Sequence, residues 1–207
     1  MSVSTQTYGS TSMIISRLGT EPADFGFDGV VELEEFIERL QTYASGEVVE
    51  FTGQLFDRFE NHVDVIDGTG RRAIKTKNYP VLEIHEIAEG SSRVSENKYQ
   101  LEATSGRPDR NAGVIKRLDR RRWSRRQITI EYDWGYDETP SAVDSVVEDM
   151  VVEALERHAA MRESQAKQTE SMDGFSVTYA LGDVQDYMSL TESMQERLRP
   201  LKRRGRA

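Results

Sequence analysis

Residues 113–158 read GVIKRLDRRRWSRRQITIEYDWGYDETPSAVDSVVEDMVVEALERH, and the predicted fold depends mainly on this stretch. Within it, residues 127–134 alternate polar and apolar side chains, the pattern of a strand with one buried face. Thr139 and Pro140 then favour the start of a helix, as N-cap and first helical residue. We expect this strand and this helix to build the core. Their apolar side chains are Ile128, Ile130, Tyr132 and Trp134 in the strand, and Val143, Val146, Val147, Met150, Val151, Ala154, Leu155 and His158 in the helix.

Residues 31–44 predict an acidic helix, because large apolar side chains recur there at helical spacing while glutamates occupy the other faces. Gly46 is its expected end, and a second short helix is expected over residues 47–53. Residues 1–28 are rich in Ser, Thr and Gly and show no apolar period. They indicate a flexible N-terminal arm.

A β section is expected between the two main helices. The Asp-Gly pair at 67–68 predicts a hairpin turn between a strand over 63–65 and a return strand around Ile74, because Asp-Gly tolerates positive φ. Residues 81–87 predict a further strand whose imperfect alternation indicates a bulge. Shorter strands are expected at 99–103 and 113–115.

The C-terminal part predicts a short strand and a capped short helix beyond a polar linker. Their apolar residues are Phe175, Val177 and Tyr179 in the strand, and Leu190, Met194 and Leu198 in the helix. Because neither element can bury its apolar face alone, we expect this part to bind a partner.

The predicted fold class is α+β. It combines a small helical core, made of the acidic N-terminal helix and the long helix led by Pro140, with a β-hairpin or sheet section and an extended C-terminal arm. The expected limits are an arm over 1–28, a core over 29–163, a linker over 164–174 and a C-terminal arm over 175–207.

The net charge of −9 is divided by sign along the chain. Residues 1–60 carry eleven acidic and three basic side chains, whereas residues 107–126 carry nine basic and two acidic ones. Such segregation favours contact between copies or with partners, with a merely solvated face for each segment as the alternative. The basic segment, with Trp123 among its arginines, could also bind phosphates and stack on a base.

The sequence offers little for catalysis. There is no cysteine, and His62, His85 and His158 stand at no ligand spacing. Phosphate-loop and nucleophile-elbow motifs are missing, so we expect no enzyme activity, cofactor or metal. We also expect no membrane segment and no signal peptide. Twenty-one arginines against six lysines in an acidic chain are typical of proteins from concentrated salt, and also of GC-rich coding, so a halophilic host is a hypothesis.

A series of short motifs follows the acidic helix in a fixed order. They are GQLF at 53–56, DG at 67–68, PV at 80–81, Trp123, YDWGY at 132–136, Pro140, GFSVTY at 174–179 and LRP at 198–200, followed by basic residues. Over residues 31–204, this order resembles the head–tail connector (adaptor) proteins of tailed viruses. The arginine-dense run at 117–126 and the arm over 1–28 depart from the family pattern, which leaves open which surfaces face the channel and which face neighbours.

The resemblance implies a structural virion protein, made in the host cytoplasm and located in the neck between capsid and tail. It implies a dodecameric ring that docks on the portal and extends the DNA channel. The implied partners are the portal protein, a tail-side neck, stopper or tail-terminator protein, and further copies of the chain, while DNA passes without specific binding.

The resemblance also implies that the C-terminal segment grips the portal. The residues expected there are Phe175, Val177, Tyr179, Leu190, Met194, Leu198, Arg199, Lys202, Arg203 and Arg204. From the charges we expect contacts between ring members at Arg117, Arg120, Arg121, Arg122, Arg125 and Arg126. Because DNA has to slide, the channel wall should be acidic or neutral, and we expect Glu32, Glu35 and Glu38 to face it.

Two alternatives stay open. One is another neck-ring protein of the stopper type, although stoppers are usually β-barrels without two dominant helices. The other is a cytoplasmic nucleic-acid-binding protein that uses residues 107–126.

Overall fold

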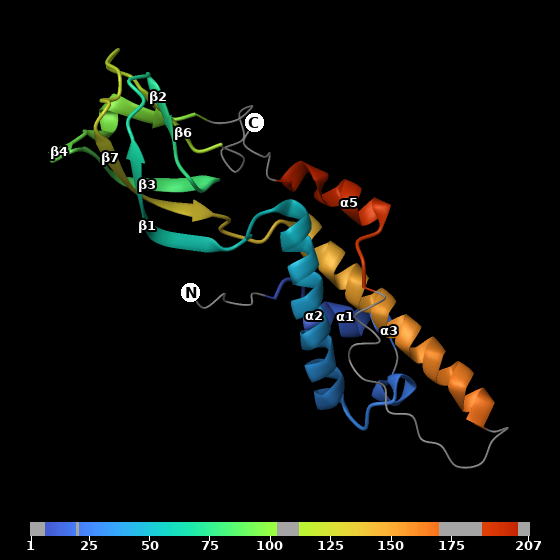
Figure 1. Ribbon diagram of the computed structural model, residues 1–207. Coiled ribbons are helices and arrows are strands. Elements are labelled where there is room, and N and C mark those ends of the chain that lie inside the picture. Colours follow the sequence, from blue (N-terminus) through green and yellow to red (C-terminus); the bar gives the residue numbers. More distant parts are fainter. Residues whose placement is uncertain (1–6, 20, 103–111, 170–187, 203–207) are drawn as a thin grey trace. The chain divides into compact units, whose positions relative to one another are not determined.

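The computed structural model describes residues 7–19, 21–102, 112–169 and 188–202, and for residues 163–169 it describes the backbone alone. The fold is α+β, as predicted (Figure 1). The chain divides into two compact units, a helical unit of residues 1–54 and 140–207 and a β unit of residues 55–139. The core predicted over 29–163 is therefore divided, because the β section has a hydrophobic core of its own.

The helical unit is built on two long helices, α2 (Val30–Thr52) and α3 (Ser141–Thr169). Two shorter helices, α1 (Thr11–Leu18) and α5 (Glu192–Leu198), pack against α3. Short 3₁₀ turns η1 (Pro22–Phe25) and η4 (Arg199–Leu201) complete it. The apolar stripe predicted on α3 is buried from Val143 to Leu155, and His158 is half-buried beside Phe27 and Phe36.

α2 is one continuous helix, and the prediction that it ends at Gly46 is wrong. Gly46 is exposed while Ser45 and Val48 are buried, so packing of the neighbouring turns outweighs the low helix propensity of one glycine. The helix ends at Gly53, where a φ of 70° lets the N–H reach the carbonyl oxygen of Val49 at 2.8 Å.

The described part of the predicted N-terminal arm is folded. Ser10 caps α1 by accepting a hydrogen bond from the N–H of Met13, and Gly19 ends the helix with a φ of 59°. Eight residues are too few to show a clear apolar period, which is why the sequence did not predict this helix. The side chains that anchor the segment in the helical unit are Tyr8, Ile14 and Phe25, all buried.

The β unit contains two antiparallel sheets. The larger has the order β1-β7-β3-β4, formed by β1 (Arg58–Asp67), β7 (Gln127–Gly135), β3 (Val81–Glu89) and β4 (Ser92–Arg93). The smaller has the order β2-β6-β5, formed by β2 (Ala73–Lys75), β6 (Val114–Arg117) and β5 (Tyr99–Leu101). Both sheets contribute to one core, with Ile128 and Ile130 from β7 and Ile115 from β6. The irregularity predicted in 81–87 is present, because the register of β3 against β7 shifts twice.

The hairpin predicted around the Asp-Gly pair is not formed. β1 pairs with β7, whereas Ile74 lies in β2 and pairs with Ile115 of β6. The N–H of Gly68 instead donates to the carbonyl oxygen of Arg126 at 3.0 Å. A Cβ at position 68 would lie 1.8 Å from the carbonyl oxygen of Ser124, so this glycine is required by the close approach of a distant segment.

Candidate interaction surfaces

The arginine-rich segment contains one residue that faces inward. Arg117 is 7% exposed, and its guanidinium contacts Asp119 at 2.8 Å and Glu89 at 3.0 Å. It also lies over the indole of Trp123, 4.8 Å from the ring centroid. The hydrogen bond from Arg117 lowers the pKa of Asp119 to about 2. Arg117 thus stabilises the β unit from inside, and the inter-subunit contact predicted for it does not fit its burial.

The other five predicted arginines are exposed, and the fold adds two more to them. The N–H of Trp123 donates to the carbonyl oxygen of Arg71 at 2.8 Å, and the N–H of Arg117 donates to that of Arg72 at 2.9 Å. The two segments therefore run side by side. We call the seven exposed residues the arginine patch: Arg71, Arg72, Arg120, Arg121, Arg122, Arg125 and Arg126. Arg71 and Arg72 were missed because only this tertiary pairing brings them to the segment.

Trp123, which lies among the arginines in sequence, is itself buried. It is 1% exposed and belongs to the core of the β unit. The idea that Trp123 stacks on a nucleic-acid base therefore does not fit this conformation, because a base needs an accessible aromatic face.

The C-terminal helix packs against other helices of its own chain. α5 packs against α2 and α3, and this contact buries Met194 and Leu198. Those two residues are thus core contacts of the helical unit rather than free contacts for a portal. Leu190 is half-buried, while Arg199 and Lys202 are exposed. The other predicted portal contacts lie outside the described residues: Phe175, Val177, Tyr179, Arg203 and Arg204.

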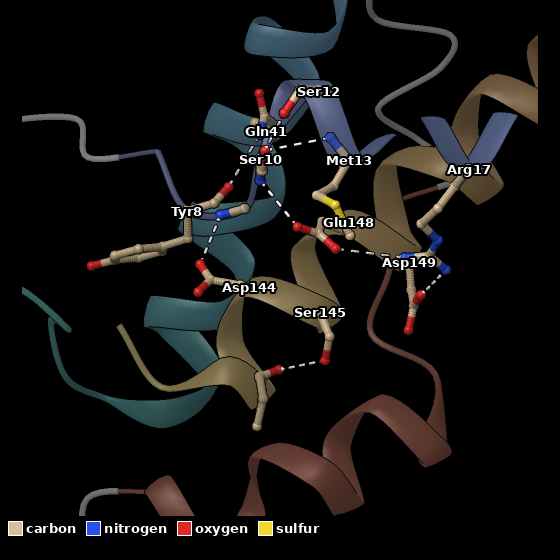
Figure 2. A network of polar contacts seen from close by, with 12 residues as sticks. Tyr8, Ser10, Ser12, Met13, Arg17, Gln41, Asp144, Ser145, Glu148 and Asp149 are labelled. Atoms are coloured by element: carbon tan, nitrogen blue, oxygen red, sulfur yellow. Dashed lines mark hydrogen bonds and ion pairs between the residues drawn. The ribbon is translucent and has the colours of Figure 1, made fainter. Parts of the chain in front are cut away.

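One carboxylate of α3 joins both short helices. Asp149 accepts hydrogen bonds from Arg17 of α1 at 2.5 Å (Figure 2) and from Arg197 of α5 at 2.6 Å. Burial by itself raises the pKa of Asp149, but the hydrogen bonds from the two guanidinium groups outweigh it and lower that pKa. Arg197 also donates to the hydroxyl of Ser145. Periodicity gave no sign of this site, because its members come from three separate segments.

The chain before α1 is held by side chains of α2 and α3. The N–H of Tyr8 donates to the hydroxyl of Ser45 at 2.9 Å. Figure 2 shows the N–H of Ser10 donating to the carboxylate of Glu148 at 3.1 Å. The N–H of Gly9 donates to Asp144 at 2.9 Å. These contacts give the backbone near the N-terminus a fixed path within the helical unit.

The acidic helix exposes the three glutamates expected at a channel wall, Glu32, Glu35 and Glu38. Within the described ranges, Glu35 forms a loose ion pair with Arg39, 3.9 Å away. Val31 is 67% exposed beside them.

The histidines make structural contacts. Nε2 of His85 lies 2.7 Å from the carboxylate of Asp133, and this hydrogen bond raises the pKa of His85. Burial lowers the pKa of His158. Among the described residues, no three acidic or histidine side chains gather as a set that could hold a metal ion.

No protein-family model matches this chain, and no curated protein matches it. Within the described ranges, no helix has both the length and the apolar character needed to cross a membrane.

Proposed function

We propose that this chain is a head–tail adaptor subunit of a tailed virus. Copies of it form a closed ring, dodecameric by the resemblance, that docks on the portal and continues the DNA channel toward the tail. The work of such a protein lies in contacts with the portal, with tail-side neck proteins and with its own copies.

The observation that carries this proposal is the structural position of the motifs in the ordered series. Gly53 ends α2, and Trp123 is buried in the core of the β unit. Gly135 has a φ of 106°, and a Cβ there would lie 1.8 Å from the carbonyl oxygen of Asp57. The motifs within the described residues therefore mark turning points and the core of the fold, which supports a resemblance at the level of architecture.

The exposed basic residues after α5 offer the most direct test of portal contact. Removing residues 175–207 would strip Met194 and Leu198 from the helical core, so a truncation would confuse folding with binding. Arg199 and Lys202 are exposed, and substituting them leaves Met194 and Leu198 in place. The substitution of Lys202 removes one further contact, that of its Nζ with the ring of Phe51, 4.4 Å from the centroid.

We expect the double substitution Arg199→Glu/Lys202→Glu to weaken binding to the virus's own portal protein by about tenfold or more, because contact-range charge pairs are reversed. The matched control is Arg93→Glu/Arg157→Glu, which makes the same charge change at exposed positions elsewhere. Equal binding by wild type and both variants would contradict a portal contact at Arg199 and Lys202.

The arginine patch also favours a second candidate function, nucleic-acid binding. Arginine side chains suit phosphate as well as carboxylate, and such binding would fall steeply with salt. Tight, salt-sensitive binding of duplex DNA by the monomer, together with no affinity for portal, would favour this second function over the adaptor.

A further inference from the structure

Within the described ranges, no guanidinium of the arginine patch forms an ion pair, although the charge of Arg121 contributes to lowering the pKa of Asp119. None of its seven arginines pairs with another described residue, whereas most arginines elsewhere in the described ranges do. The paired ones are Arg17, Arg39, Arg58, Arg93, Arg117, Arg157 and Arg197. In a chain of 36 acidic and 27 basic residues, carboxylates are not scarce. Seven like charges in one place repel one another, so the patch is suited to an anionic partner from outside.

The backbone beneath the patch is fixed. The N–H of Arg121 donates to Asp119 at 3.2 Å, and Asp119 is itself bound by the buried Arg117. Arg120 has a φ of 61°, a left-handed conformation that is uncommon for a residue other than glycine. Such conformations persist where the surroundings enforce them, and they often occur at functional sites. The arginines are therefore presented on a preorganised loop, which lowers the entropy lost on binding.

The patch lies at the end of the β unit remote from both of its chain connections. The pairing of β1 with β7 runs from Arg58 opposite Gly135 to Asp67 opposite Gln127. Both connections to the helical unit leave at the first end, while the patch residues follow Asp67 and precede Gln127 at the second. A strand of this length spans about 33 Å. Another molecule can thus approach the patch away from those connections.

The partner is better explained as protein than as nucleic acid. Trp123 is buried, so no aromatic face from this segment is offered to a base. The exposed large hydrophobic side chain of the segment is instead aliphatic: Leu118 is 47% exposed, two residues before Arg120. An apolar contact rimmed by charges is the usual composition of a protein–protein interface.

The chain carries a complementary surface on α2. Val31, Glu35 and Glu38 stand at positions i, i+4 and i+7, which share one helix face. This face presents an exposed aliphatic side chain beside exposed carboxylates, the counterpart of Leu118 beside the arginines. Residues Val30–Thr52 contain six glutamates and one arginine, so the helix as a whole is strongly acidic.

We propose that the arginine patch and Leu118 of one copy dock on the Val31, Glu35 and Glu38 face of α2 in a second copy. Such a contact joins two different surfaces, so it repeats head to tail and can close into a ring. The inference rests on the proposed adaptor function in one respect: the ring proposed there is the assembly in which this contact repeats from copy to copy. It replaces the channel-facing role expected for Glu35 and Glu38, because a residue in this contact is not free to line the channel.

The test is a charge swap measured by analytical ultracentrifugation of the full chain. In the patch variant, Arg71→Glu/Arg72→Glu/Arg121→Glu/Arg122→Glu/Arg125→Glu, five of the seven exposed arginines are replaced, so acidic side chains outnumber basic ones in both segments of the patch taken together. In the helix variant, Glu35→Arg/Glu38→Arg, the partner face is reversed. We expect each variant alone to self-associate at least about tenfold more weakly than wild type, since like charges then face each other. An equimolar mixture should assemble again, because each variant's altered surface meets a complementary one on the other.

The control Arg93→Glu/Arg157→Glu should assemble like wild type. Restored assembly in the mixture also shows that both variants are folded. The inference would be overturned if wild type assembles and the mixture of variants does not. It would also be overturned if the helix variant assembles alone, which is the result expected if these glutamates line the channel. Loss of duplex DNA binding in the patch variant, with self-association unchanged, would identify a phosphate-binding surface and also overturn it. Portal binding, measured on the same samples, reports separately on the proposed adaptor function.

Discussion

At the scale of single residues, Asp133 is a buried charged side chain that contacts both strands flanking β7 in the larger sheet. Its buried carboxylate accepts hydrogen bonds from Arg58 at 2.9 Å, the N–H of Asn61 at 2.9 Å and His85 at 2.7 Å. Arg58 and Asn61 belong to β1 and His85 belongs to β3, the two strands that flank β7. Both strands shift register against β7 near Asp133. The bulges thus turn donors toward one carboxylate and fix the alignment of three strands.

Asp133→Asn should lower the free energy of unfolding by about 1–3 kcal/mol, because buried donors lose a charged acceptor. The control is Asp137→Asn, since Asp137 contacts the same Arg58 at 2.6 Å but is exposed. That variant should change stability by less than about 0.5 kcal/mol. Urea denaturation followed by fluorescence measures the free energy of unfolding of both variants. Equal losses would show that the burial of Asp133 adds nothing to its contribution to stability.

The same contact predicts a pH dependence. The hydrogen bond to Asp133 raises the pKa of His85 in the folded state, so its contribution is complete below the ordinary histidine pKa of about 6.5 and is lost as pH rises through the folded value. Burial raises the pKa of Asp133, but hydrogen bonds from His85, Asn61 and Arg58 lower it overall, so its contribution is lost as pH falls through that lowered value. The contributions of His85 and Asp133 to stability are therefore both complete between about pH 4 and about pH 6.5.

His85→Gln should therefore destabilise the protein more at about pH 5.5 than at about pH 8.5. The measurement is the urea midpoint of wild type and variant at both values, with other titrating groups common to the two proteins. A stability difference that does not change with pH would contradict a charged His85–Asp133 pair.

At the scale of elements, α3 organises the helical unit through its apolar stripe. Val147 lies in the middle of that stripe and is fully buried. Val147→Asp should cost more than about 3 kcal/mol and unfold this unit, because a carboxylate would be buried without a partner. Ala160→Asp, at an exposed position of the same helix, is the control. Circular dichroism distinguishes them, and a native helical signal for Val147→Asp would refute the assignment of the stripe to the core.

The Asp149 site predicts coupled behaviour of α1 and α5. Asp149→Ala removes the shared acceptor of Arg17 and Arg197, so backbone amides in both helices should exchange hydrogen several times faster, about threefold or more. Glu153→Ala, which removes only a 3.9 Å pair with Arg157, should leave them unchanged. Hydrogen–deuterium exchange measures this, and faster exchange in α5 alone would show that Arg17 does not depend on Asp149.

The elements that the sequence predicted well are those with a long local pattern. The α3 stripe and the alternation in β7 span enough residues for periodicity to identify them. Asp67-Gly68 was misleading because its turn chemistry is local, whereas the N–H of Gly68 bonds to Arg126 across the unit. The place of Arg71 in the arginine patch and the burial of Arg117 were missed for the same reason, since neither position has a local signal for what it contacts in the fold.

At the scale of the whole molecule, the protein combines two folded units with strongly charged, separate surfaces. The arginine patch belongs to the β unit and the acidic face of α2 to the helical unit. At about 1 M salt the screening length falls to about 3 Å, so only contact-range arginine–carboxylate pairs would persist. We expect assembly to weaken from about 0.1 M to about 1 M salt but to persist if the contact is tight, which sedimentation over that range can follow. Complete indifference to salt would argue against a charged contact.

The central claim is that this chain forms a ring that docks on a portal. Negative-stain electron microscopy of the full chain, alone and mixed with the portal protein of the same virus, tests it most directly. The account predicts closed rings with a central channel, stacked coaxially on the portal in the mixture. Single copies that never form rings and leave the portal unaltered would contradict it.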